Sequence, residues 1–221
     1  MSHWAVVGSG PSGKHIGERD LLAPTVVVVN MAVEYIPPQW IDYHLFRHPR
    51  LHRFFDRLIE HDVKLLSFPD WHEKEKQKSE RLTEPPEWIG KVGMLESRDE
   101  WLKDKNDRTI TWERGTYSPY RDPIGPQAVQ FCVNNGATLI ECWGLEGGPW
   151  KFVEYDSRTQ KVLTAKNRGR ESLMDAAKYH RKIIQAVIDE CPDVEFIFYG
   201  DLMYALEGDN VRTQPWPNGT S

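Results

Sequence analysis

Cysteine is scarce in this sequence, with only Cys132, Cys142 and Cys191 among 221 residues. They are widely spaced and lie in apolar stretches, so we expect buried, reduced thiols rather than disulfides or a zinc knuckle. No stretch approaches the roughly 20 apolar residues that a membrane-spanning helix needs. The first residues also lack a signal-peptide pattern, because the apolar run 4–7 ends at Gly8. These absences predict a cytoplasmic protein with no membrane span.

An excess of positive charge is missing too, since the formal net charge is -5 at pH 7. This balance argues against indiscriminate binding to a polyanion such as nucleic acid. Lysines do recur at Lys74, Lys76 and Lys78, but glutamates interrupt them, which is typical of a solvated face. We therefore expect a small-molecule or glycan partner rather than a nucleic acid, and the sequence predicts no oligomeric state.

Apolar runs alternate with segments of helical periodicity along most of the chain. Strands are expected at residues 4–7, 25–29, 41–46, 63–68, 138–142 and 194–199, and helices at about 49–59, 122–135 and 171–190. The run 25–29 holds four consecutive valines, as in strands buried on both faces. This alternation predicts a single Rossmann-like α/β domain over residues 1–200, with a mostly parallel sheet that binds its ligand beyond the strand carboxyl ends.

Three segments depart from the alternation. Residues 69–120 are rich in Lys, Glu, Arg, Trp and Pro, and we expect an inserted, lid-like excursion there. A hairpin is expected between 150–155 and 161–164. The tail 201–221 contains Pro215 and Pro217 and is expected to be loosely held.

A glycine-rich turn, Gly-Ser-Gly-Pro-Ser-Gly at residues 8–13, follows the first expected strand. Such a turn lets backbone amides approach an anion, and a helix after it would offer its positive end. The turn does not complete the P-loop pattern G-x-x-x-x-G-K-[ST], because His15 stands where that pattern has serine or threonine. It has the glycine spacing of a dinucleotide-binding turn, but Asn30 stands where an acidic residue is usual after the second strand. A carboxamide can bind a ribose or a base, so we expect a nucleotide-type ligand here. A purely structural bend, with Asn30 as a loop cap, is the alternative.

The histidines His44, His48 and His52 recur every four residues, which on one helix would align metal ligands. Pro49 argues against a single helix, so no metal site is expected. Arg47 and His48 instead fall at a strand end, where we expect them to contact the ligand.

Charged groups also flank the later elements. Glu146 follows the strand at 138–142 and could bind a hydroxyl, a base edge or a metal, or serve as a base. Arg168 and Arg170 precede the last long helix and could meet phosphates, with a solvated basic loop as the alternative. His180 falls beside the apolar face of that helix and is expected to be a core histidine.

The segments Val6-Val7-Gly8-Ser9-Gly10-Pro11-Ser12, Val29-Asn30 and Phe46-Arg47-His48-Pro49 resemble the small bacterial sialyltransferases that act on lipooligosaccharide. They are equally similar to a related domain that includes archaeal 6-hydroxymethylpterin pyrophosphokinases and motility-associated glycosyltransferase-like proteins. The resemblance implies that the nucleotide is held by Gly8, Ser9, Gly10, Ser12 and Asn30. A looser similarity at Ile124-Gly125, Asn135-Gly136-Ala137 and Gly144-Leu145-Glu146 adds Gly125 and Gly144.

This chain departs from the sialyltransferase pattern at two places. The histidine base that those enzymes place before the last long helix is missing from Asn167-Arg168-Gly169-Arg170, and their Thr-Ser before the central helix is Pro123-Ile124 here. Nucleotide binding does not depend on either group.

The leading hypothesis is a transferase with a nucleotide-activated donor, most simply a nucleotide sugar, with Glu146 or His48 activating the acceptor and no cofactor required. The second is magnesium-dependent transfer of a pyrophosphoryl or phosphoryl group to a small hydroxymethyl acceptor, with magnesium on Glu146. The third is a non-catalytic module that senses a nucleotide or docks a partner.

Overall fold

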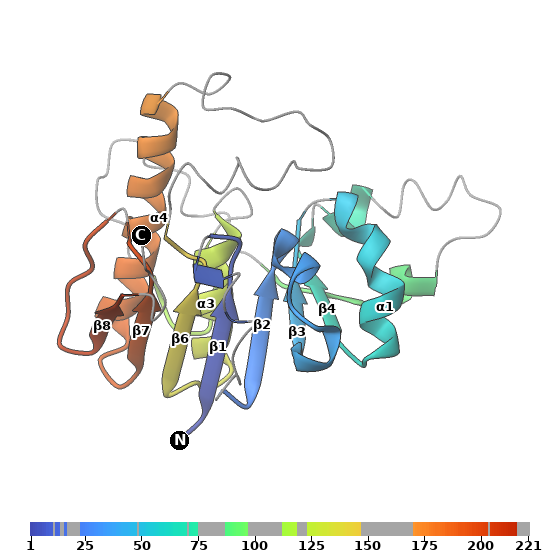
Figure 1. Ribbon diagram of the computed structural model, residues 1–221, viewed down its shortest axis with the longest axis horizontal. Coiled ribbons are helices and arrows are strands. Elements are labelled where there is room, and N and C mark those ends of the chain that lie inside the picture. Colours follow the sequence, from blue (N-terminus) through green and yellow to red (C-terminus); the bar gives the residue numbers. More distant parts are fainter. Residues whose placement is uncertain are drawn as a thin grey trace.

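The expected strands form one parallel sheet in the structure, a computed structural model (Figure 1). It describes residues 1–10, 12, 13, 16, 23–47, 49–69, 71–74, 87–96, 112–118, 123–146, 170–202 and 204–215. Within these residues the strands are β1 (His3–Val7), β2 (Thr25–Val29), β3 (Tyr43–Leu45), β4 (Lys64–Ser67), β5 (Val92–Met94), β6 (Leu139–Trp143), β7 (Glu195–Tyr199) and β8 (Val211–Gln214). This confirms the α/β, Rossmann-like fold class.

The strand order is β5-β4-β3-β2-β1-β6-β7-β8, and every pair is parallel. The chain moves outward from β1 through β2 to β5, and then returns to place β6 on the other side of β1. The topological switch point therefore lies between β1 and β6. Ligands of open α/β sheets bind at such a point, beyond the carboxyl ends of the strands.

Helices cover both faces of the sheet. They are α1 (Phe55–Glu60), α3 (Ile124–Asn134) and α4 (Arg170–Glu190), with 3₁₀ turns η2 (Asn30–Glu34), η3 (Pro38–Trp40), η4 (Pro49–Phe54) and η5 (Glu87–Lys91). Helices α3 and α4 pack against one face and α1 against the other (Figure 1). The valines of β2 alternate between the two resulting cores, which explains their unbroken run.

Two expected elements differ from the structure. The helix expected at 49–59 is divided into η4 and α1, and the strand expected at 41–46 is limited to Tyr43–Leu45. The prediction of a loosely held tail is wrong for residues 211–214, which form β8 beside β7. The Asn210 side chain fastens this strand, because its Nδ2 lies 2.8 Å from the carbonyl oxygen of Cys191 and 3.0 Å from that of Val194.

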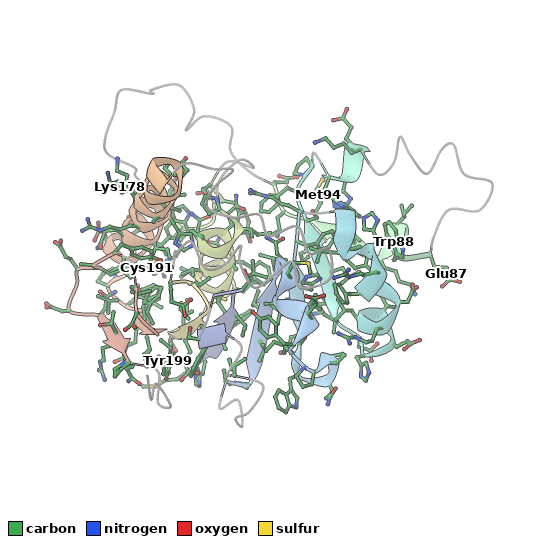
Figure 2. The ribbon with its side chains drawn as sticks, turned by 45° about the horizontal axis from the view of Figure 1, so that its top comes forward. Glu87, Trp88, Met94, Lys178, Cys191 and Tyr199 are labelled. Carbon is green, nitrogen blue, oxygen red and sulfur yellow. The ribbon has the colours of Figure 1, made fainter. Side chains whose placement is uncertain are left out.

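Parts of the expected excursion belong to the body of the domain. Strand β5 extends the sheet beside β4, and Trp88 of η5 is buried next to Trp71 and Phe55. Figure 2 labels Trp88 beside its neighbour Glu87, which is exposed. Residues 75–86 and 97–111 and the expected hairpin at 150–155 and 161–164 lie outside the described residues. The lid-like character of the excursion stays a prediction.

The three cysteines form no disulfide and are fully buried, as expected. Burial raises the pKa values of the Cys132 and Cys142 thiols well above the ordinary value. Among the described helices, none combines the length and the apolar character that a membrane span requires.

One buried histidine makes stability depend on pH. His44 of β3 is fully buried, stacks on Phe46, and its Nε2 lies 3.0 Å from the carbonyl oxygen of Asn30. Burial lowers the pKa of His44 from 6.5 to about 4, although the bond to Asn30 acts in the opposite direction. Between these values the unfolded chain binds the proton more readily than the folded one, so stability falls as the pH drops from about 6.5 towards 4.

We expect His44 to contribute a loss of about 2 kcal/mol in the free energy of unfolding between pH 7 and pH 5. His44→Gln should remove this part of the pH dependence. Urea denaturation of both proteins at the two pH values measures it, with His61→Gln, in an exposed turn, as the control. Equal pH dependence of wild type and His44→Gln would show that the buried ring is not responsible.

Candidate functional site

Several of the predicted ligand-binding residues meet at one edge of the sheet. Because all strands are parallel, the turn after β1, Asn30 after β2, Arg47 after β3 and Glu146 after β6 lie at the same edge. Val7 pairs with Trp143 in the register of β1 and β6, so the turns after these two strands begin side by side. The site therefore sits at the switch point.

The glycine turn packs backbone to backbone against the end of β6. The Gly8 amide donates to the carbonyl oxygen of Trp143 at 2.7 Å, and the Gly10 amide to that of Gly144 at 2.8 Å. A Cβ atom added at Gly8 would lie 2.5 Å from the Gly144 oxygen. One added at Gly144, where φ is +68°, would lie 2.2 Å from the Gly8 oxygen. The glycine spacing thus permits a close approach of two loops, and these amides are used inside the protein rather than offered to an anion.

Ser12 connects the loops after three strands. Its hydroxyl donates to the carbonyl oxygen of Tyr199 at 3.0 Å and accepts from the Gly144 amide at 2.7 Å. Its own amide donates to Glu146 Oε1 at 2.7 Å. Ser12 is fully buried. Its hydrogen-bonding groups hold the ends of β1, β6 and β7 together, a role that the sequence reading did not anticipate.

The Glu146 carboxylate lies beneath the turn, with 2% of the residue exposed. Its Oε2 has no hydrogen-bond partner among the described residues. A Cβ atom at Gly10 would lie 1.8 Å from Oε2, and one at Gly200 would lie 2.7 Å from Oε1. Glycine at both positions therefore makes room for the carboxylate and also covers it. The expected roles of Glu146 as a base or a magnesium ligand stay predictions, and both require the turn to move away from Oε2.

Asn30 adopts a left-handed conformation, with φ of 48°, immediately after β2. Its Oδ1 accepts the Arg47 amide at 3.2 Å, and its carbonyl oxygen accepts from His44 Nε2. Asparagine tolerates this backbone conformation better than most residues. The side chain does cap the loop after β3, as the structural alternative requires. Its amide nitrogen is not used in these bonds, and the residue is half-buried at the edge.

Arg47 carries a positive charge to the N-terminal end of α3. Its guanidinium donates to Gln127 Oε1 in the first turn of that helix and lies over the Phe68 ring, 4.7 Å from the centroid. The helix starts without a capping side chain at Pro123 and without an acidic residue in its first turn. The positive helix end and the guanidinium are thus close together, an arrangement that an anion would stabilise.

Gly125 makes room for a buried histidine. A Cβ atom there would lie 2.9 Å from Leu145 Cδ2 and 3.1 Å from His180 Nε2. His180 Nδ1 lies 2.8 Å from the Tyr204 hydroxyl, which donates to the Leu145 carbonyl oxygen at 2.8 Å. Since the hydroxyl proton is used there, His180 Nδ1 is the donor. Burial raises the pKa of Tyr204 well above its ordinary value. The prediction of a core histidine is confirmed.

The structure does not describe all of the predicted site residues. His48 and Arg168 lie outside the described residues, and the side chain of Arg170, the first residue of α4, is not described. Ser9 is half-buried in the glycine turn. Among the described residues, no group of three or more histidine, cysteine or acidic side chains could hold a metal ion.

Sequence reasoning missed three residues that shape the site. Gln127 binds Arg47, Tyr35 donates its hydroxyl to the Gly8 carbonyl oxygen at 2.9 Å, and Tyr204 binds Leu145. Only Gln127 carried a usable signal, since it is a polar residue on a helix whose other early positions are apolar.

Comparisons with family models, curated proteins and solved structures found no match.

Proposed function

We propose that this chain is a transferase that uses a nucleotide-activated donor, most simply a nucleotide sugar. The observation that carries the proposal is the placement of Arg47 at the N-terminal end of α3, at the carboxyl edge of a parallel sheet. The charge of the Arg47 guanidinium and the positive end of the α3 dipole favour a ligand with phosphate groups there. The resemblance of the turn and Asn30 to the small sialyltransferases adds to this support.

In the proposed site the ligand phosphates lie beside Arg47 and the first turn of α3. The half-buried Asn30 and Ser9 stand next to them at the ends of β2 and β1, and the Asn30 amide nitrogen supplies a donor for the nucleotide. Transfer forms a bond between the acceptor hydroxyl oxygen and the transferred group and breaks the bond between that group and the donor phosphate. The hydroxyl proton passes to a base, for which Glu146 and His48 stay the candidates, and Arg47 stabilises the charge that develops on the leaving phosphate.

A second candidate is magnesium-dependent pyrophosphoryl transfer, which the unpartnered Glu146 Oε2 favours. Carboxylate oxygens suit Mg²⁺, which is commonly held by one or two carboxylates together with substrate phosphates. This candidate has less support, because Gly10 covers that oxygen. A strict magnesium requirement and release of AMP from ATP would favour it, whereas metal-independent turnover of a nucleotide sugar would favour the first.

The first test is a thermal-shift screen with nucleoside mono-, di- and triphosphates and nucleotide sugars at millimolar concentration. Stabilisation by one nucleotide series, followed by turnover of a matching sugar donor, is the expected result. No shift with any compound would contradict the proposal. Tight binding without turnover of any donor would instead indicate a nucleotide-sensing module.

Asn30→Asp separates the two roles of Asn30. The aspartate keeps the oxygen that caps the Arg47 amide but replaces the amide donor with a charge, so stability should change little. We expect the affinity for the best nucleotide to fall by about 10- to 100-fold. Calorimetric titration and urea denaturation measure the two effects, with Asn30→Gly as the control that loses the cap. A pure loop cap would give the reverse: unchanged nucleotide affinity in Asn30→Asp.

A further inference from the structure

Helix α3 holds the backbone of residues 112–118 with buried amide side chains. Gln130 Oε1 accepts the Ser118 amide at 2.9 Å, and Gln127 Nε2 donates to the Ser118 carbonyl oxygen at 2.8 Å. Both glutamines and Ser118 are fully buried. Two neighbouring turns of one helix thus bind both backbone groups of a single residue.

The same helix face continues to Asn134, one turn further. Its Oδ1 accepts the Gly115 amide at 2.7 Å, and its Nδ2 donates to the Thr116 carbonyl oxygen at 2.8 Å. Spacings of three and four residues place side chains on one side of a helix. Segment 112–118 is therefore docked along α3 by a row of carboxamides rather than by apolar contact alone.

Gln127 differs from the other two amides because it also binds Arg47. Its Nε2 donates to Ser118, and its Oε1 accepts from the Arg47 guanidinium. A carboxamide has one donating and one accepting end. Binding of the nitrogen to the Ser118 carbonyl therefore turns the oxygen towards Arg47. The bond to Ser118 thus contributes to holding the Gln127 oxygen towards the guanidinium.

We propose that Gln127 is a positioning residue that couples the docking of segment 112–118 to the orientation of Arg47, and so to the anionic group of the ligand. The inference rests on the proposed function, in which Arg47 binds that anion. It goes further because it makes a segment distant in the sequence a determinant of anion affinity. A merely structural Gln127 would fasten the segment as Gln130 does and leave the anion site unaffected.

The test compares Gln127→Met with Gln130→Met, using inorganic pyrophosphate as the probe. Each variant loses one hydrogen bond to Ser118 from a fully buried position, but only Gln127→Met also loses the bond to Arg47. We expect similar falls in melting temperature. The Kd for pyrophosphate, from calorimetric titration at fixed ionic strength, should rise about tenfold or more in Gln127→Met and less than about threefold in Gln130→Met.

Gln127→Glu serves as the second variant, in case the methionine at this position prevents folding. A carboxylate there can still bind Arg47, but it competes with an anion for the guanidinium, so pyrophosphate affinity should fall at least as far as in Gln127→Met. Equal pyrophosphate affinity in the Gln127 and Gln130 variants would overturn the coupling and leave the proposed function intact. Wild-type protein that bound neither pyrophosphate nor any nucleotide of the thermal-shift screen would overturn both.

Discussion

Gly10→Ala is expected to destabilise the protein by more than about 3 kcal/mol, because the new methyl group would collide with a side chain that has no room to move. The added Cβ would lie 1.8 Å from Glu146 Oε2 and 2.8 Å from the Gly144 carbonyl oxygen. The Glu146 carboxylate is fixed by the Ser12 amide on one side and closed in by Gly200 on the other. Urea denaturation measures the loss.

A double variant identifies the cause of that loss. In Gly10→Ala with Glu146→Ala the closest contact disappears and only the backbone contact to Gly144 remains, so the double variant should be less destabilised than the two single effects predict, by about 1 to 3 kcal/mol. Gly90→Ala is the matched control, since nothing lies within 4 Å of a Cβ atom there. Full additivity, or a Gly10→Ala variant as stable as Gly90→Ala, would contradict the described packing.

Gly144→Ala is expected to be the more damaging of these two substitutions. The free energy of unfolding should fall by more than about 4 kcal/mol, or no folded protein should form. The new Cβ would lie 2.2 Å from the Gly8 carbonyl oxygen and 3.0 Å from the Gly10 nitrogen, and both contacts are with backbone. Neither can shift without breaking the hydrogen bonds between the turns after β1 and β6.

Gly136→Ala provides the comparison. Gly136 also has a positive φ, of +82°, but a Cβ atom there meets nothing within 4 Å. Gly136→Ala should lower the free energy of unfolding by about 1 kcal/mol, the cost of the left-handed backbone alone. The difference between the two variants, from urea denaturation, isolates the steric contact between the loops. Similar losses would show that φ rather than packing makes glycine necessary at Gly144.

The sheet was predictable wherever burial on both faces left an unbroken apolar run. The valines of β2 are such a run, and the segment 138–142 is apolar at Leu139, Ile140 and Cys142 with Glu141 between them; both became central strands. Strand β8 was missed because its residues are mostly exposed and polar, and it is defined by its pairing with β7 rather than by its own composition. Edge strands with one partner commonly lack an apolar signal.

The edge that holds the candidate site was predictable, whereas the contacts within it were not. Glycines at Gly8 and Gly10 indicate a close approach of something to the backbone, but the sequence does not say what approaches. The structure places the Gly144 carbonyl and the Glu146 carboxylate there, both from the turn after β6, more than a hundred residues away. Gln127 binds Arg47, 80 residues away, and Tyr204 binds Leu145, 59 residues away, and local patterns do not encode such contacts.

The bonds of Ser12 set the order in which the site can be completed while the chain is being made. Its hydroxyl binds the carbonyl of Tyr199, 187 residues further along, and its amide binds Glu146, 134 residues further along. Contacts of such long sequence separation form late, since they require closure of a long loop. The turn after β1 is synthesised before these partners and is therefore among the last parts of the site to reach its final conformation. Until β6 and β7 have been synthesised, the candidate site of a nascent chain is incomplete.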